Sequence, residues 1–140
     1  MSVVLDTQAM LILYLEEKGA ERVAELLTQV LEGKIKGYMS VVNLAELYYI
    51  LARKSSKIAE EKERNLRSFG IRIVPVKGDP EDAAMWKEAA LLKASPSLSL
   101  SLSLAYAFAA ATAKVLSSTL VTGSDPEFER IKGIRTERVG

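Results

Sequence analysis

Three carboxylates stand where the surrounding sequence gives them no obvious structural partner. Asp6 directly follows the apolar run "VVL", and Asp125 follows "LVTGS" at the end of a second apolar run. Glu46 lies in a helical pattern whose neighbours three and four residues away are mostly apolar. Buried carboxylates close together repel one another, and a hard divalent cation such as Mg²⁺ relieves that repulsion through oxygen ligands and waters. Together the three acids indicate a candidate cation site.

Each acid also has a plain structural interpretation. Asp is common in turns and at helix N-caps, which could account for Asp6 or Asp125 taken alone. Glu46 could pair with a lysine or be capped by Asn43. Two acids that end separate core strands favour the site interpretation, because ligand sites in open parallel sheets form outside the carboxyl ends of strands.

The residue types that are missing narrow the chemistry further. The chain has no Cys and no His, which excludes a disulfide framework, a thiolate or imidazole zinc site, and imidazole acid–base catalysis. Its net charge of +1 argues against a strongly basic coat for nucleic acid, although a local basic patch could still serve a polyanionic substrate. Any chemistry must come from carboxylates, hydroxyls, lysines or a bound cation.

Length and composition are those of one soluble domain. With 140 residues, 49% of them hydrophobic and 26% charged, we expect a single domain over residues 1–140. The longest uncharged run, residues 94–113, is rich in serine and alanine and too polar for a membrane span. The first ten residues do not resemble a secretion signal, so we expect a cytoplasmic protein.

Short apolar runs alternate with helical patterns along the chain, and these are the elements that must position the acids. Ser40 and Ser103 are expected to cap helices that start at residues 41 and 104, and Asp79 is a natural N-cap for the helix that follows it. Extended segments are expected at 2–6, 35–39, 71–76, 118–122 and 133–139, with helical patterns between them and a short helical turn through 126–131. This alternation predicts an α/β fold, a three-layer α/β/α sandwich around a mainly parallel central sheet.

Four stretches in this order, "VVLDT", "VVNLAELYYIL", "LSLAYAFAAATA" and "LVTGSDPEF", resemble the PIN-domain family, and within it the VapC-like toxin ribonucleases of toxin-antitoxin pairs. The resemblance covers nearly the whole chain. It implies a Rossmann-like fold and an Mg²⁺- or Mn²⁺-dependent endoribonuclease. Carried over residue by residue, it implies a site made of Asp6, Glu46, position 106 and Asp125, with Thr122 as the polar residue at a strand end.

Position 106 departs from the family pattern. The family has Ser-Leu-Ala-Asp-Ala where this chain has Ser-Leu-Ala-Tyr-Ala, so Tyr106 stands where an acid is expected. A phenol is neutral at physiological pH and cannot replace that charge. The resemblance therefore implies an activity that is reduced or absent. The Ser-Leu repeat before it, residues 97–104, is open between a loop entering the helix, an extra edge strand and a flexible segment.

Partners follow from the resemblance and from local charge. An RNA substrate would be held through its phosphates, for which Arg53, Lys54 and Lys57 are candidates, together with Lys62, Arg64 and Arg67. Interleaved glutamates leave open a solvated helix with paired charges. The resemblance also implies an antitoxin protein and a homodimer, for which the apolar faces of the early helices, including Tyr48 and Tyr49, are candidate surfaces.

Three other functions remain as alternatives. A non-catalytic PIN-like domain could bind an antitoxin-like partner or RNA without cleaving it. A haloacid-dehalogenase-like phosphatase also starts with an acid after its first strand, but it expects a second Asp two residues on, where this chain has Gln8. A receiver domain expects an acidic pair before the first-strand acid, where Val3, Val4 and Leu5 stand instead.

Overall fold

Strands and helices alternate along the part of the chain that the computed structural model describes, which is residues 1–78, 83–95, 103–123, 131 and 133–140. The elements are β1 (Ser2–Leu5), α1 (Thr7–Tyr14), α2 (Ala20–Leu31), β2 (Lys36–Ser40), α3 (Val41–Ala52), α4 (Ser56–Ser68), β3 (Arg72–Val74), α5 (Ala83–Ala94), α6 (Leu104–Val115), β4 (Thr119–Thr122) and β5 (Thr136–Arg138). The described helices reach at most 13 residues, and none of them has the length and apolar character needed to span a membrane.

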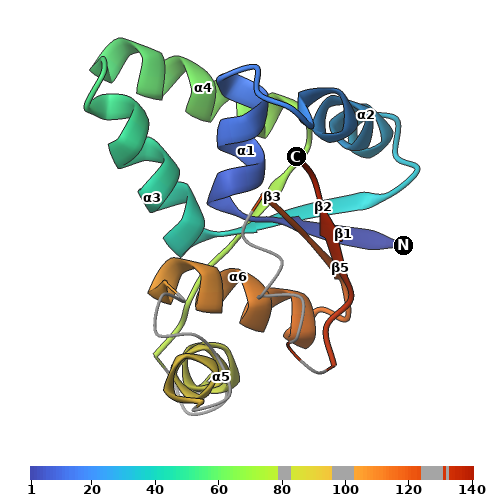
Figure 1. Cartoon of the computed structure of the whole chain (residues 1–140), viewed down its shortest axis with the longest axis vertical. Coiled ribbons are helices and arrows are strands. Elements are labelled where there is room, and N and C mark those ends of the chain that lie inside the picture. Colours follow the sequence, from blue (N-terminus) through green and yellow to red (C-terminus); the bar gives the residue numbers. More distant parts are fainter. Residues whose placement is uncertain (79–82, 96–102, 124–130, 132) are drawn as a thin grey trace.

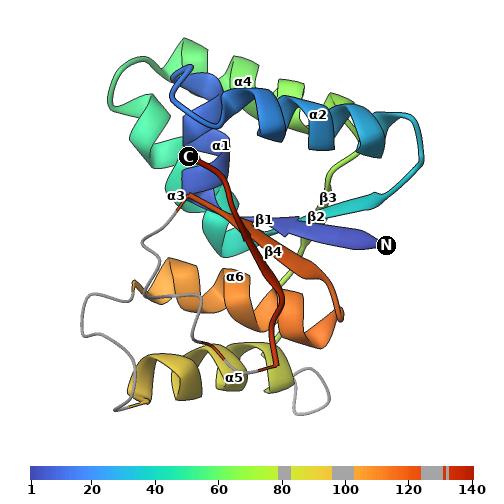
Figure 2. The same cartoon turned by 45° about the vertical axis from the view of Figure 1, so that its right-hand side comes forward.

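The five strands form one sheet in the order β3-β2-β1-β4-β5, and every pairing between them is parallel. Helices α1, α2 and α4 cover one side of this sheet and α5 and α6 cover the other, as Figures 1 and 2 show. The predicted three-layer α/β/α sandwich is therefore confirmed, and the sheet is parallel throughout its described strands.

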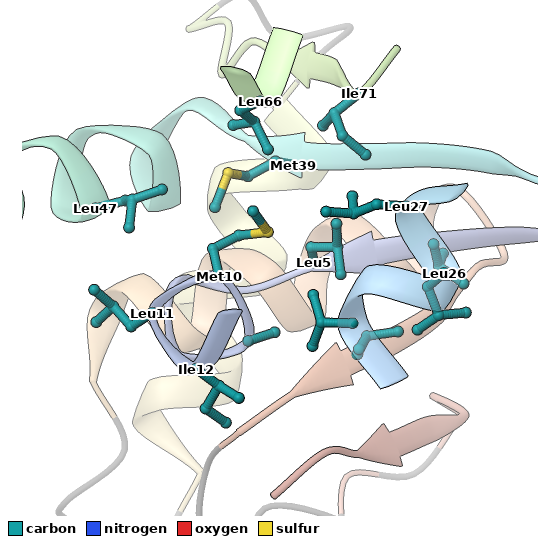
Figure 3. Packing of buried hydrophobic residues seen from close by; sticks show 14 of the residues in the cluster. Leu5, Met10, Leu11, Ile12, Leu26, Leu27, Met39, Leu47, Leu66 and Ile71 are labelled. Carbon is teal, nitrogen blue, oxygen red and sulfur yellow. The ribbon is translucent and has the colours of Figure 1, made fainter. Parts of the chain in front are cut away.

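The central strand β1 is buried on both faces, which explains why it is a continuous apolar run. Val3 and Leu5 belong to the cluster formed with α1 to α4, while Val4 between them belongs to the cluster formed with α5 and α6. Figure 3 shows the first cluster, in which Met10 of α1 and Met39 of β2 point toward each other at its centre. The position of Asp6, immediately after Leu5, is fixed by this packing.

Two of the three predicted serine and aspartate caps can be checked. Ser40 accepts a hydrogen bond from the Val42 N–H at 3.2 Å, and Ser103 accepts one from the Tyr106 N–H at 3.0 Å, so both N-cap predictions are confirmed. The Asp79 cap, residues 97–102 of the Ser-Leu repeat and most of the predicted turn at 126–131 lie outside the described residues.

The edge strand β5 is linked to helix α2 by an ion pair between residues far apart in sequence. The Arg22 guanidinium donates to both carboxylate oxygens of Glu137, at 2.7 and 3.1 Å. These hydrogen bonds, together with the charge of Arg22, lower the pKa of Glu137 below its ordinary value, although partial burial opposes the shift. The charged pair therefore stabilises the folded chain.

We predict that Glu137→Gln lowers the free energy of unfolding by about 1 kcal/mol or less at pH 7, because both side chains are about one third exposed. A carboxyl whose pKa is lowered on folding contributes stability above its unfolded pKa and loses it as the pH falls through the folded value. The difference between the variant and the original chain should therefore shrink in acid, as measured by urea unfolding from pH 7 to pH 3. A difference that stays constant would contradict this account; Glu25→Gln, which removes the more exposed partner of Arg22, is the matched control.

Candidate active site

The strand order brings two polar residues together at one point of the sheet. The chain runs outward from β1 in both directions, through β2 on one side and β4 on the other, and in such sheets ligands bind at this switch point outside the carboxyl ends of the strands. Leu5 pairs with Val121, so the next residues along are Asp6 and Thr122. The Asp6 N–H also donates to the Val121 carbonyl at 3.1 Å, which holds the two strand ends together.

The carboxylate of Asp6 is only 2% exposed and is held from two sides. One oxygen accepts a hydrogen bond from the Ala9 N–H at 2.8 Å and caps helix α1. The other oxygen accepts a hydrogen bond from the hydroxyl of Thr122. Each carboxylate oxygen has two lone pairs, so the N-cap that the structure confirms uses only part of the acceptor capacity of Asp6. Capping and cation binding are compatible roles for this residue.

Glu46 lies half-buried in the second turn of helix α3. Within the described part of the chain it forms no ion pair with a lysine or arginine, and Asn43 uses its side chain elsewhere. Among the described residues, Glu46 is therefore neither paired with a lysine nor capped by Asn43, and both structural interpretations are wrong there. A partly buried carboxylate that has no basic partner in the described ranges supports the site interpretation.

Asn43 and Thr7 form a polar connection that sequence reasoning missed. Both side chains are buried, at 1% and 2% exposure. The side-chain amide nitrogen of Asn43 donates to the Thr7 hydroxyl oxygen at 3.2 Å and to the backbone carbonyl of Ala105 at 3.1 Å. The Thr7 hydroxyl in turn donates to the backbone carbonyl of Asn43 at 3.2 Å. The available signal was a lone amide on an apolar helix face, three residues before Glu46.

Tyr106 lies in the first turn of helix α6, at the position where the resemblance expects an acid. Its side chain is 4% exposed and belongs to the buried cluster that includes Val4, Met85 and Ala89. The expected fourth acid is thus replaced by a buried aromatic residue. Asp125 lies outside the described residues, and among those that are described no three acids gather in a way that could hold a metal ion.

Gly123, which follows Thr122, is a second residue that sequence reasoning missed. A Cβ at this position would lie 2.5 Å from the Ile12 side chain and 3.3 Å from Gln8 Cβ. A glycine therefore allows the chain leaving β4 to pass close to the first turns of α1, next to Asp6. The signal in the sequence was a glycine directly after a strand.

The six basic residues considered for RNA binding fall into three groups, and the first is Lys62 alone, whose ammonium lies 5.1 Å from the centre of the Tyr14 ring. Arg64 and Arg67 of α4 pair with glutamates one turn earlier in the same helix, as the paired-charge interpretation expects. Arg53 and Lys54 follow helix α3, and Lys57 is the second residue of α4. All three are exposed, and the Arg53 guanidinium lies 4.9 Å from the centre of the Tyr49 ring. Within the described residues Arg53, Lys54 and Lys57 form no ion pair, and their contact with RNA stays a prediction.

The oxygen donors of Asp6 and of helix α3, which packs against α1, suit a hard cation better than a soft one. Asp6 and Glu46 supply carboxylate oxygens, and the chain has no Cys or His that could add a thiolate or imidazole ligand. Mg²⁺ and Mn²⁺ prefer such oxygen ligands. The residues present therefore fit a divalent cation, with one negative charge fewer than the resemblance expects because of Tyr106.

Comparison with known proteins gives one family and a set of similar folds. A family model described as PIN domain matches residues 3–134. Similar solved structures include VapBC2 from Rickettsia felis bound to a promoter DNA fragment, with 20% identity, a TM-score of 0.75 and both chains covered completely. VapBC-1 from nontypeable Haemophilus influenzae has 21% identity and a TM-score of 0.68, covering 99% of this chain and 98% of that one. A toxin-antitoxin complex from Klebsiella pneumoniae has 17% identity and a TM-score of 0.65, covering 98% and 99%. At these identities the structures show a shared fold; no curated protein matches significantly.

We predict that Asp6→Asn stays within about 1 kcal/mol of the original free energy of unfolding, whereas Asp6→Ala loses about 2 to 3 kcal/mol. Asparagine keeps an oxygen for the Ala9 N–H and can donate to the Thr122 hydroxyl, but alanine removes both hydrogen bonds and leaves a cavity where the carboxylate was buried. Urea unfolding at pH 7 measures the difference. Equal stability of Asp6→Ala and the original chain would mean that the carboxylate does not hold these elements together.

Proposed function

The chain belongs to the PIN-domain family, and from this premise we propose that it is a divalent-cation-dependent endoribonuclease of the VapC-like toxin type. PIN domains are in general nucleases. The observation that carries the proposal for this chain is the buried Asp6 carboxylate at the switch point, which is fixed by Thr122. The Glu46 carboxylate, which forms no ion pair with any residue that the structure describes, accompanies it.

In this proposal Asp6, Glu46 and Asp125 hold one Mg²⁺ or Mn²⁺. When bound, the cation lowers the pKa of a water molecule, orients it toward the phosphodiester and screens charge on the phosphate. The Thr122 hydroxyl keeps the Asp6 carboxylate oriented through its hydrogen bond. Glu46, which has no basic partner among the described residues, is available to accept the proton of the attacking water.

The substrate is proposed to be RNA, held through its phosphates by Arg53, Lys54 and Lys57. These side chains are exposed between the end of α3, the helix that carries Glu46, and the first turn of α4. Arg64 and Arg67 are engaged with glutamates and contribute less positive charge.

We further propose that the chain acts as one domain, forms a homodimer and pairs with an antitoxin protein. Similar solved structures are VapBC and toxin-antitoxin complexes. Helix α3 leaves apolar side chains at its surface that a partner could cover, with Val41 40% and Tyr49 47% exposed.

Tyr106 favours a second candidate function. Because a buried phenol occupies the place of the expected acid, the chain could keep the fold and bind RNA or an antitoxin-like partner without cleaving RNA. The two experiments below separate this candidate from the nuclease.

We predict that the purified chain cleaves single-stranded RNA with Mg²⁺ or Mn²⁺ and that Asp6→Asn slows cleavage about 100-fold or more, since a ligand charge is lost while the helix cap remains. Cleavage is measured as initial rates on a labelled RNA with and without chelator. Glu32→Gln, an exposed carboxylate outside the site, is the matched control and should cleave at the original rate. Absence of cation-dependent cleavage by the original chain would favour the binding function.

We predict that Tyr106→Asp lowers the free energy of unfolding by about 3 kcal/mol without metal, because a buried aromatic side chain is lost. At a Mn²⁺ concentration 100 times the Kd of this variant, binding should restore about 2.7 kcal/mol. The original chain should gain less at the same concentration, because it lacks this carboxylate and binds Mn²⁺ more weakly. Thermal unfolding with and without Mn²⁺ gives both values. Tyr106→Asn has the same shape but no charge and should gain no additional Mn²⁺ dependence. If both variants respond to Mn²⁺ as the original chain does, position 106 does not face the cation.

A further inference from the structure

Asn43 connects three helices that carry different parts of the proposed site. Its amide nitrogen reaches Thr7 of α1 at 3.2 Å and the carbonyl of Ala105 of α6 at 3.1 Å, while Asn43 itself is in α3. Figure 1 shows these three helices meeting near the carboxyl end of β1. Thr7 and Ala105 are 36 and 62 residues away from Asn43 in sequence.

These hydrogen bonds are not needed to satisfy the backbone. The carbonyls of Asn43 and Ala105 lie inside α-helices, where each already accepts from an N–H four residues on. The bonds from the Thr7 hydroxyl and from the Asn43 amide are second bonds to these oxygens. Their effect is therefore to fix the distance between helices.

The orientation of the amide group follows from its neighbours. The backbone carbonyl of Ala105 can only accept a hydrogen bond. The Thr7 hydroxyl uses its hydrogen on the backbone carbonyl of Asn43, so toward the Asn43 side chain it too can only accept. The amide nitrogen supplies both donors, and the amide oxygen is left buried with no partner among the described residues. An unsatisfied buried acceptor costs about 1 to 3 kcal/mol, which an apolar side chain of similar size would avoid.

Each residue in this connection lies beside a residue of the proposed site. Thr7 follows Asp6, Ala105 precedes Tyr106, and Asn43 lies one turn before Glu46 on the same side of α3. Thr122 is joined to the group through Asp6. A shift of α1 or α3 would therefore move Asp6 and Glu46 relative to each other, and the bond to Ala105 ties both helices to α6.

We propose that Asn43 is a positioning residue, which sets the spacing between the carboxylates of Asp6 and Glu46 by fixing α1, α3 and α6 to one another. This inference rests on the proposed cation site. It predicts that Asn43 controls cation affinity without contacting the substrate, and that losing its amide group weakens cation binding beyond any loss of stability.

The test compares Asn43→Leu, which keeps buried volume but loses both donors, with Thr112→Val. Thr112 is buried in α6, the helix that also contains Ala105, and its hydroxyl donates to the Phe108 carbonyl. The Thr112→Val variant therefore loses a buried hydrogen bond away from the site. Mn²⁺ affinity is measured by calorimetry at a temperature where both variants are folded. We expect Asn43→Leu to weaken Mn²⁺ binding at least about tenfold and Thr112→Val to change it less than about twofold. Equal affinities in Asn43→Leu and the original chain would overturn the inference.

A second measurement without metal separates this inference from the proposed function. Hydrogen exchange of the Ala9 and Ala107 amides, in the first turns of α1 and α6, should accelerate in Asn43→Leu while the amides of α2 stay protected. Unchanged exchange at both amides overturns the inference even if RNA is cleaved. If the original chain binds no Mn²⁺, the cation site fails and exchange alone decides whether Asn43 fixes the helices. Thr7→Val, which removes the hydroxyl that Asn43 contacts, repeats both measurements if Asn43→Leu does not fold.

Discussion

The rest of the structure depends on burying one carboxylate, that of Asp6. Taking a charge out of water is costly, and Asp6 offsets the cost with donors from its own helix and from Thr122. Those two hydrogen bonds set the start of α1 and the relative position of the ends of β1 and β4. Low exposure to water also strengthens any electrostatic interaction at this point. The same contacts that begin a helix therefore prepare a place where a cation could be held.

Features set by nearby residues could be predicted from the sequence. The caps at Ser40 and Ser103 involve N–H groups two and three residues away, and the buried strand β1 is visible as an uninterrupted apolar run. The contacts between Asn43 and Ala105 and between Arg22 and Glu137 join residues 62 and 115 positions apart. They depend on how helices and strands pack across layers, which no local pattern records.

Tyr106 exchanges a charge for buried apolar area. An acid at this position would add to the repulsion around Asp6 and would need a cation to offset it, whereas the aromatic ring joins the cluster beneath the sheet and packs with Val4 and Met85. The sequence predicted the loss of a charge, but not that the ring would be buried, because burial depends on how closely α5 and α6 pack. With Tyr106 in place of an acid, the stability of the fold therefore depends less on a bound cation.

Fewer acids also change what governs cation affinity. In a site with many carboxylates, relief of mutual repulsion drives binding even when the ligands are loosely placed. In a site with fewer acids that drive is smaller, so affinity depends more on ligands that already have the correct spacing before the ion arrives. The buried amide of Asn43 supplies such spacing between α1, α3 and α6, although its oxygen receives no hydrogen bond from the described residues. The loss of charge at position 106 thus places more of the proposed site's affinity on the positioning of its remaining residues.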